Sequence, residues 1–172
     1  MKKTVSALIG LMFIVTSCDI ADTPIELSAT NEITKTVDVS SPATNGTAFA
    51  FDESLSINLS EVISDIGDIT SVKINTLSFK FKDFTGNTAG VIQTISLKVN
   101  GEVLKAFTDL NVSQEATDAT VFSITDSAKL AQLESILEND STTTIQLAGS
   151  VLSDAGVMDF KIEVNINLTT TI

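Results

Sequence analysis

The sequence predicts an all-β domain: a two-sheet antiparallel β-sandwich, Greek-key or transthyretin-like, with one or two short helices. Apolar and polar residues alternate along most of the chain after residue 32, which is the period of a half-buried strand. Turn signals such as Asn-Gly separate the alternating runs. The chain has 172 residues and is 43% hydrophobic, so a single domain can form a core without a disulfide or metal. A barrel is the alternative arrangement.

The first strands are expected on either side of an Asn-Gly turn. Residues 33–39 alternate and predict one strand. Asn45-Gly46 then predicts a turn, because both residues adopt positive φ readily. Alternation resumes at Phe49 and continues through residues 55–59, which predicts the next strand.

The alternation changes phase in the middle of the following strand. Val72 and Ile74 share one phase, whereas residues 77–81 follow the other. One extra residue would cause this shift, so we expect a β-bulge at Asn75-Thr76.

A tight hairpin is predicted next. Residues 91–99 alternate and are followed by Asn100-Gly101 and then by Val103. Asn-Gly between two alternating runs favours a two-residue hairpin turn. A further short strand is expected at residues 121–124.

Two amphipathic helices are expected to lie on a sheet edge as lids or crossovers. Residues 127–138 place leucine and isoleucine on one stripe, with Asp126 as the N-cap. A shorter helix is predicted over residues 61–66, capped by Ser60 and ended by Gly67.

The last strand shows the clearest pattern. Apolar residues alternate strictly with polar ones from Phe160 to Thr169, after a preceding strand at residues 145–151. The segment from Met158 to Ile172 would extend roughly 50 Å as a strand, longer than usual. We therefore expect part of it to overhang the sheet or to bend between sheets.

The composition excludes most catalytic chemistry. The chain has no His, Arg, Trp or Tyr, and it has one Cys. Catalytic triads and Cys-His pairs therefore lack their base, and zinc, haem and blue-copper sites lack their ligands. No glycine-rich phosphate motif is present. We expect a non-enzyme with no catalytic residue and no cofactor.

Carboxylates are the remaining reactive groups. Three pairs are candidates for paired-acid chemistry: Asp52 with Glu53, Asp65 with Asp68, and Asp154 with Asp159. We interpret them as solvated surface charge, since a sugar site would normally stack its ligand on Trp or Tyr. Asp65, Asp68 and Asp154 are also candidate calcium ligands in short acidic turns, although no complete calcium-loop motif is present.

The N-terminus carries a distinct set of signals. Met1-Lys2-Lys3 is basic, and residues 4–15 form an apolar run that is too short to span a bilayer. Val15-Thr16-Ser17-Cys18 follows, with the only cysteine of the chain. This segment resembles the lipobox of bacterial lipoproteins, and the whole plan is similar to that of Bacteroidetes-type exported β-sandwich lipoproteins.

The resemblance implies cleavage between Ser17 and Cys18 and the attachment of palmitate-type acyl chains to Cys18. Each buried CH₂ would contribute ~0.8 kcal/mol to membrane binding. It divides the chain into a signal peptide at residues 1–17, a lipidated Cys and tether at 18–31, and a single domain at 32–172. The protein would then lie in the bacterial cell envelope, at the periplasmic or surface-exposed face of the outer membrane.

Charge excludes other modes of attachment. After residue 17 the chain keeps eight Lys against 22 acidic residues, so nucleic acid and anionic headgroups would repel it. The predicted function is a structural or interaction module, with the membrane as one partner and an envelope protein or glycan as the other.

Two alternatives remain open. One is a fimbrial or polymerising subunit that adds its C-terminal strand to a neighbour. Fimbrial lipoproteins mature by cleavage at a basic residue in the early strands, for which Lys35 is the candidate here. The other is a calcium-dependent glycan-binding module.

Overall fold

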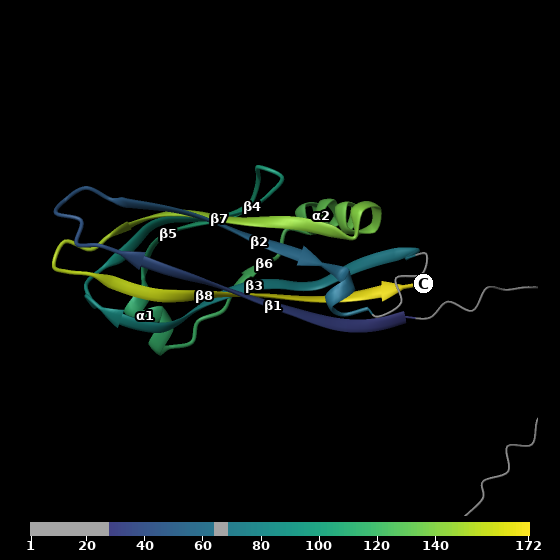
Figure 1. The fold of residues 1–172 in the computed structure, drawn as a ribbon, viewed down its shortest axis with the longest axis horizontal. Helices are drawn as coiled ribbons and strands as arrows, with labels where there is room; N and C mark the ends of the chain where they lie inside the picture. Colours follow the sequence, from purple (N-terminus) through teal and green to yellow (C-terminus); the bar gives the residue numbers. More distant parts are fainter. Residues whose placement is uncertain (1–27, 64–68) are drawn as a thin grey trace, which may run out of the picture.

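The structure is a computed structural model that describes residues 28–63 and 69–172. These residues form two four-stranded antiparallel sheets packed face to face, elongated along the strand direction (Figure 1). The predicted β-sandwich is confirmed.

Each sheet contains strands that are distant in the sequence. In spatial order, sheet A contains β1 (Ser28–Ser41), β8 (Met158–Thr171), β3 (Ser71–Gly86) and β6 (Phe122–Ile124). Sheet B contains β2 (Phe49–Asn58), β7 (Thr142–Leu152), β4 (Val91–Val99) and β5 (Glu102–Asn111).

The strand pairs are nested. β1 pairs with β8, β2 with β7, β3 with β6, and β4 with β5. This is the pattern of one long antiparallel hairpin rolled into a sandwich, the jelly roll, which contains two Greek keys. The structure therefore selects the Greek-key option of the prediction.

Phenylalanines organise the centre of the core. Phe81 contacts Phe79 and Phe160 edge-on, with ring centroids 5.7 Å apart in both pairs. Phe79 also lies stacked against Phe122 at 5.0 Å. Edge-to-face and offset contacts of this kind add to the free energy gained by burial. All four of these phenylalanines lie on strands of sheet A, which therefore contributes most of the aromatic packing.

The predicted bulge and turns are present. The pairing of β3 with β8 shifts between Ile74 and Thr76. Asn100 and Gly101 have φ of 50° and 82°, as a two-residue hairpin turn requires. The turn at Asn45-Gly46 also has positive φ at both residues.

Of the two predicted helices, one is confirmed and one differs. α2 (Ser127–Asp140) begins after Asp126, which accepts hydrogen bonds from the backbone N–H groups of Ala128 and Lys129. In place of a helix that starts at Glu61, a single 3-10 turn, η1 (Leu59–Glu61), is capped by Asn58. Residues 64–68 lie outside the described residues.

The sequence interpretation missed one helix. α1 (Val112–Thr117) begins after Asn111, whose side chain accepts a hydrogen bond from the backbone N–H of Gln114. The cap is typical of a helix start, but six residues are too few to show helical periodicity.

The expectation about the end of β8 is wrong. β8 does not overhang, because β1 pairs with it from Ser28↔Thr171 to Ser41↔Met158 and β3 pairs with its other edge. The first strand is longer than expected: β1 runs from Ser28 to Ser41 and so includes residues on both sides of the predicted segment at residues 33–39.

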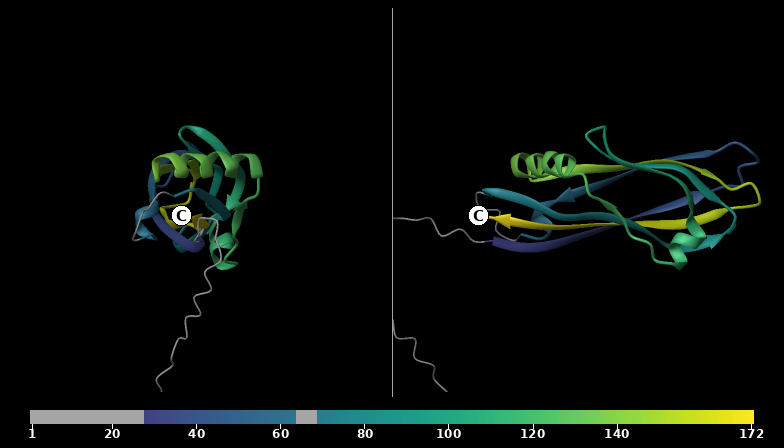
Figure 2. Two further views of the ribbon diagram at one scale, coloured as in Figure 1. Left: turned by 90° about the vertical axis from the view of Figure 1, so that its right-hand side faces the viewer. Right: turned by 180° about the vertical axis from the view of Figure 1, so that it is seen from behind.

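The two ends of the sandwich carry different elements. The start of β1, the C-terminus and α2 lie at one end, which we call the terminal end (Figures 1 and 2). The opposite, distal end carries the four loops β1–β2, β3–β4, β5–β6 and β7–β8.

Candidate functional site

Asp154 forms the centre of a polar cluster in the distal loops. Its Oδ1 accepts a hydrogen bond from the backbone N–H of Gly46 at 2.6 Å and another from the Thr44 hydroxyl at 2.7 Å. These two donors, the Gly46 N–H foremost, hold the pKa of Asp154 below its ordinary value of 3.8. The ionised carboxylate thereby joins the β7–β8 loop to the β1–β2 loop.

Ser153 extends this cluster into the interior. Its backbone N–H donates to the Thr44 hydroxyl at 2.9 Å, and its own hydroxyl donates to the Gly156 carbonyl at 2.6 Å. Asn87 of the β3–β4 loop donates to the Ser153 hydroxyl at 3.0 Å. Thr44 and Ser153 are both buried. We name Thr44, Gly46, Asn87, Ser153 and Asp154 the distal loop cluster.

The β3–β4 and β7–β8 loops also approach each other through their backbones. Gly86 has φ of +103°, and a Cβ there would lie 2.2 Å from the Val157 carbonyl oxygen. Only glycine fits this position. Hydrogen bonds and close backbone contact therefore both hold these loops against each other.

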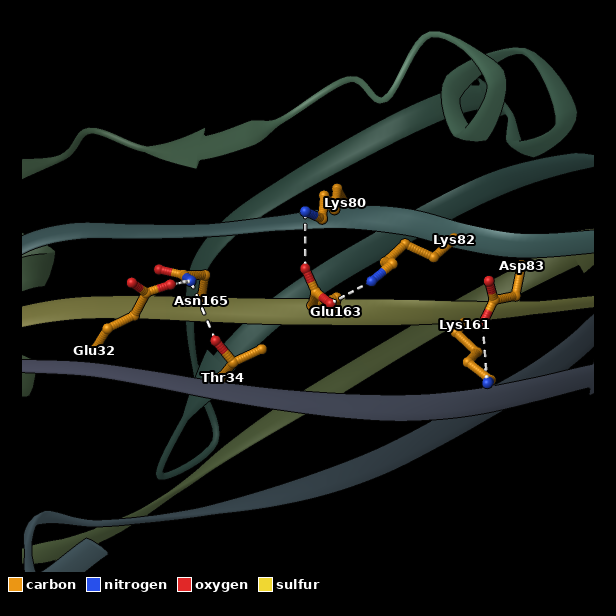
Figure 3. Close-up of polar contacts among 8 residues, drawn as sticks. All are labelled: Glu32, Thr34, Lys80, Lys82, Asp83, Lys161, Glu163 and Asn165. Carbon is orange, nitrogen blue, oxygen red and sulfur yellow. Dashed lines mark hydrogen bonds and ion pairs between the residues drawn. The ribbon is translucent and has the colours of Figure 1, made fainter. Parts of the chain in front are cut away.

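The outer face of sheet A is charged but internally paired. Glu163 accepts from Lys80 at 2.9 Å and from Lys82 at 2.7 Å, while Lys161 pairs with Asp83 at 2.9 Å (Figure 3). The two lysine hydrogen bonds lower the pKa of Glu163, and the bond to Glu163 raises the pKa of Lys82. The charges of Lys80, Lys82 and Lys161 are therefore matched by carboxylates.

A shallow hollow adjoins this charged face. Asn165 donates from Nδ2 to Glu32 and, at 3.3 Å, to Thr34 (Figure 3). Beside Asn165 the hollow has a volume of about 210 Å³ and is walled by Val121, whose surface is 57% exposed. It is small and open to solvent, unlike the enclosed pockets that hold small molecules.

The outer face of sheet B differs in chemistry. Small residues leave an open depression of about 390 Å³, and Asp52 there accepts two hydrogen bonds from Gln146 at 2.7 and 2.9 Å. The lining residues are Ala50, Phe51, Asp52, Thr94, Ser96, Ala148, Gly149 and Ser150.

The structure places only some of the residues singled out in the sequence. Ser17, Cys18, Asp65 and Asp68 lie outside the described residues. Asp154 does not form a site with other acids: within residues 28–63 and 69–172 no three His, Cys, Asp or Glu side chains gather as a metal site.

The structure also describes the other acids that the sequence paired, except Asp65 and Asp68. Asp159, in β8, accepts from the Ser40 hydroxyl at 2.5 Å, away from the bonds made by Asp154. Asp52 and Glu53 are consecutive residues within β2. A general acid at neutral pH needs a raised pKa, whereas the pKa values of Asp154 and Glu163 are lowered. These groups act as ionised hydrogen-bond acceptors.

Lys35, the candidate for fimbrial maturation, lies inside a strand. Its backbone pairs with Val164 of β8, and its Nζ bonds both carboxylate oxygens of Glu61 at 2.7 Å. Cleavage at this residue would require β1 to separate from β8.

Sequence reasoning missed the distal loop cluster as a unit. The Asn45-Gly46 turn and the acidic turn at Asp154 were each visible, but these turns are 108 residues apart. Only the nested strand pairing brings them together.

The comparisons with known proteins give distant structural matches alone. No family model and no curated protein matches the chain. Among solved structures, it is similar to the decameric BFDV capsid protein, with 6% identity over 84% of this chain and 99% of that one and a TM-score of 0.43. The infectious bursal disease virus VP2 subviral particle gives 15% identity and a TM-score of 0.36, with 96% of this chain and 40% of that one covered. The match with the infectious bursal disease virus Gx strain covers the same shares, at 14% identity and a TM-score of 0.32. At these identities and scores the likeness carries no functional argument.

The part of the chain that the structure describes contains no helix long and apolar enough to cross a bilayer.

Proposed function

We propose that this protein is a lipid-anchored, exported module of the bacterial cell envelope that acts by presenting a surface to a partner. The observation that carries the proposal is the segment Val15-Thr16-Ser17-Cys18, which follows a short apolar run and contains the only cysteine of the chain. Lipid on Cys18 would attach the domain to the membrane, since 22 acidic residues against eight Lys after residue 17 would repel anionic headgroups.

The position of β1 indicates which end of the domain a lipid on Cys18 would hold near the membrane. β1 begins at Ser28, and the start of this strand lies at the terminal end. Residues 18–27 reach at most roughly 35 Å when fully extended, so the terminal end stays near the bilayer. β8 has 14 residues and spans roughly 48 Å at the rise of a strand. The distal loop cluster therefore stands on the side of the domain away from the anchor.

The fixed geometry of the distal end supports a binding role. Three of its loops are joined by hydrogen bonds to buried Thr44 and Ser153. A surface that is already ordered loses little conformational entropy when it binds a partner. An envelope protein or a glycan is the class of partner that a loop surface in this position would meet.

The two alternative functions have less support. In the strand-addition alternative β8 would have to leave the centre of sheet A, where both of its edges are paired. In the calcium-dependent alternative Asp154 would have to exchange the donors Thr44 and Gly46 for a cation.

The anchor is tested by replacing its sulfur. In Cys18→Ser expressed in bacteria we expect no incorporation of labelled palmitate and release of the protein from membranes. Ser17→Ala is the matched control, because a small residue at this position retains the lipobox pattern and the lipid. Membrane retention of Cys18→Ser after alkaline carbonate washing would contradict the proposal.

A further inference from the structure

The edge of sheet A next to β6 is only partly covered by a strand. β6 pairs with Leu77–Phe79 alone, although β3 runs from Ser71 to Gly86. The β3 segment at Ser71–Asn75 therefore has no strand partner on this side within the described residues. An edge of this kind presents backbone N–H groups that can pair with another chain.

Two carboxylates of α2 occupy the place of the missing strand. The backbone N–H of Val72 donates to Glu138 Oε1 at 2.8 Å, and that of Ile74 donates to Glu134 Oε1 at 2.7 Å. Glu134 and Glu138 are four residues apart on a helix, about 6.0 Å along its axis. Val72 and Ile74 are two residues apart on a strand, about 6.8 Å. The helical spacing thus matches the spacing of donors along the edge.

α2 is held in this position by further contacts. Leu133 and Leu137 are fully buried in the core. On the neighbouring hairpin, Glu102 accepts hydrogen bonds from Lys129 and from Gln132. The helix therefore joins the edge of sheet A to sheet B and keeps its two glutamates aligned with β3.

We propose that α2 guards this edge, with Glu134 and Glu138 binding the Val72 and Ile74 N–H groups so that a second copy of the chain cannot pair with β3. A second copy carries the same edge and needs no special side chains, because backbone pairing supplies the contact. Val72 and Ile74 point into the core while Lys73 is exposed, so an added strand would continue the existing alternation.

The other edge of sheet A is protected by a different means. The side chain of Lys35 on β1 reaches across to Glu61 and bonds it at 2.7 Å. Inward-pointing charges are one way in which natural sheets prevent edge pairing. The β3 edge lacks such a charge among Val72 and Ile74, so the α2 carboxylates carry the protection there.

The test compares Glu134→Ala/Glu138→Ala with two matched variants of the same helix. All are made in the chain without residues 1–17 and with Cys18→Ser, so that lipid does not cause association. Glu134→Gln/Glu138→Gln keeps a carbonyl acceptor at each position. Ser135→Ala/Asn139→Ala alters two exposed residues whose only side-chain hydrogen bond among the described residues joins them to each other within α2. Amide hydrogen exchange and light scattering after gel filtration are measured for each protein.

In the alanine variant we expect exchange at Val72 and Ile74 to accelerate roughly tenfold or more at low concentration. We also expect a concentration-dependent dimer in which these two amides become protected again. The glutamine variant and the Ser135→Ala/Asn139→Ala control should remain monomeric and protected.

If Glu134→Ala/Glu138→Ala stays monomeric, the proposal that α2 prevents strand pairing at this edge is overturned, whether or not the Val72 and Ile74 amides exchange faster. If the double variant does not fold, the single variants decide the matter. Glu134→Ala should expose only Ile74, and Glu138→Ala only Val72, each with weak self-association. Unchanged exchange at both amides or strictly monomeric singles would overturn the proposal.

Discussion

Different interactions stabilise the two ends of the sandwich. At the distal end, buried hydroxyls and one ionised carboxylate connect three loops. At the terminal end, a helix packs two leucines into the core and covers a sheet edge with carboxylates. Loops are too short to bury much apolar surface, so hydrogen bonds fix them, whereas α2 can use its apolar stripe. We therefore expect the loss of single polar atoms at the distal end to lower the stability of the fold. At the terminal end, the loss of buried side-chain volume should lower it.

The largest effect is expected from Leu137→Ala at the terminal end. Leu137 is 0% exposed, and removing a fully buried leucine side chain costs about 2–5 kcal/mol of unfolding free energy. Urea denaturation measures the loss. Ile136→Ala, at a partly buried neighbour, is the control and should cost clearly less. Equal losses for the two variants would contradict the burial assigned to Leu137.

Thr44→Val tests the distal end with a change that keeps the shape of the side chain. The variant removes the hydroxyl that accepts from the Ser153 N–H and donates to Asp154. The buried N–H then lacks a partner, which costs about 1–3 kcal/mol. Thr47→Val, at an exposed residue of the same loop, is the control. A stability equal to wild type would show that water replaces the hydroxyl without cost.

Asp154→Asn should change the pH dependence of stability. The folded-state pKa of Asp154 is lowered by Gly46 and Thr44, so the carboxylate stabilises the folded chain fully above its ordinary pKa of 3.8. This contribution is lost as the pH falls through the lowered folded-state value. The difference in Tm between wild type and Asp154→Asn should be largest near neutral pH and vanish in acid. A difference that is constant with pH would exclude the ionised carboxylate as its cause.

The smallest effect is expected for Glu102→Gln at the terminal end. Lys129, foremost, and Gln132 lower the pKa of Glu102 by hydrogen bonding, but the group lies in solvent, where ion pairs contribute little. Calorimetry should give a Tm within about 2 °C of wild type, with the difference disappearing at high salt. A large, salt-independent loss would mean that the pair, and not the leucines, holds α2.

The local sequence pattern predicted where the strands lie along the chain better than it predicted which strands lie side by side. Strict alternation from Phe160 identified β8, and the change of phase at Asn75-Thr76 identified the bulge. These signals depend on residues close together in the sequence. They do not show that β8 is an interior strand of its sheet. Its length alone therefore suggested an overhang, which the pairing on both of its edges contradicts.

The contacts that distinguish the two ends were beyond sequence reasoning. Asp154 and Gly46 meet only because β1 and β8 are neighbours. Glu134 and Glu138 face β3 only because β6 ends at Ile124 and the chain turns into α2. Acidic residues on a helix normally indicate a solvated surface, and nothing in their spacing reveals a strand edge as their partner.

The orientation of the two ends relative to the membrane tests the central claim most directly. Thr47→Cys at the distal end and Asn139→Cys at the terminal end each introduce a thiol on an exposed residue, which can be labelled alone because lipid occupies Cys18. In vesicles with an acceptor dye in the bilayer, we predict strong energy transfer from position 139 and weak transfer from position 47. Equal transfer from the two positions, or stronger transfer from position 47, would contradict the account.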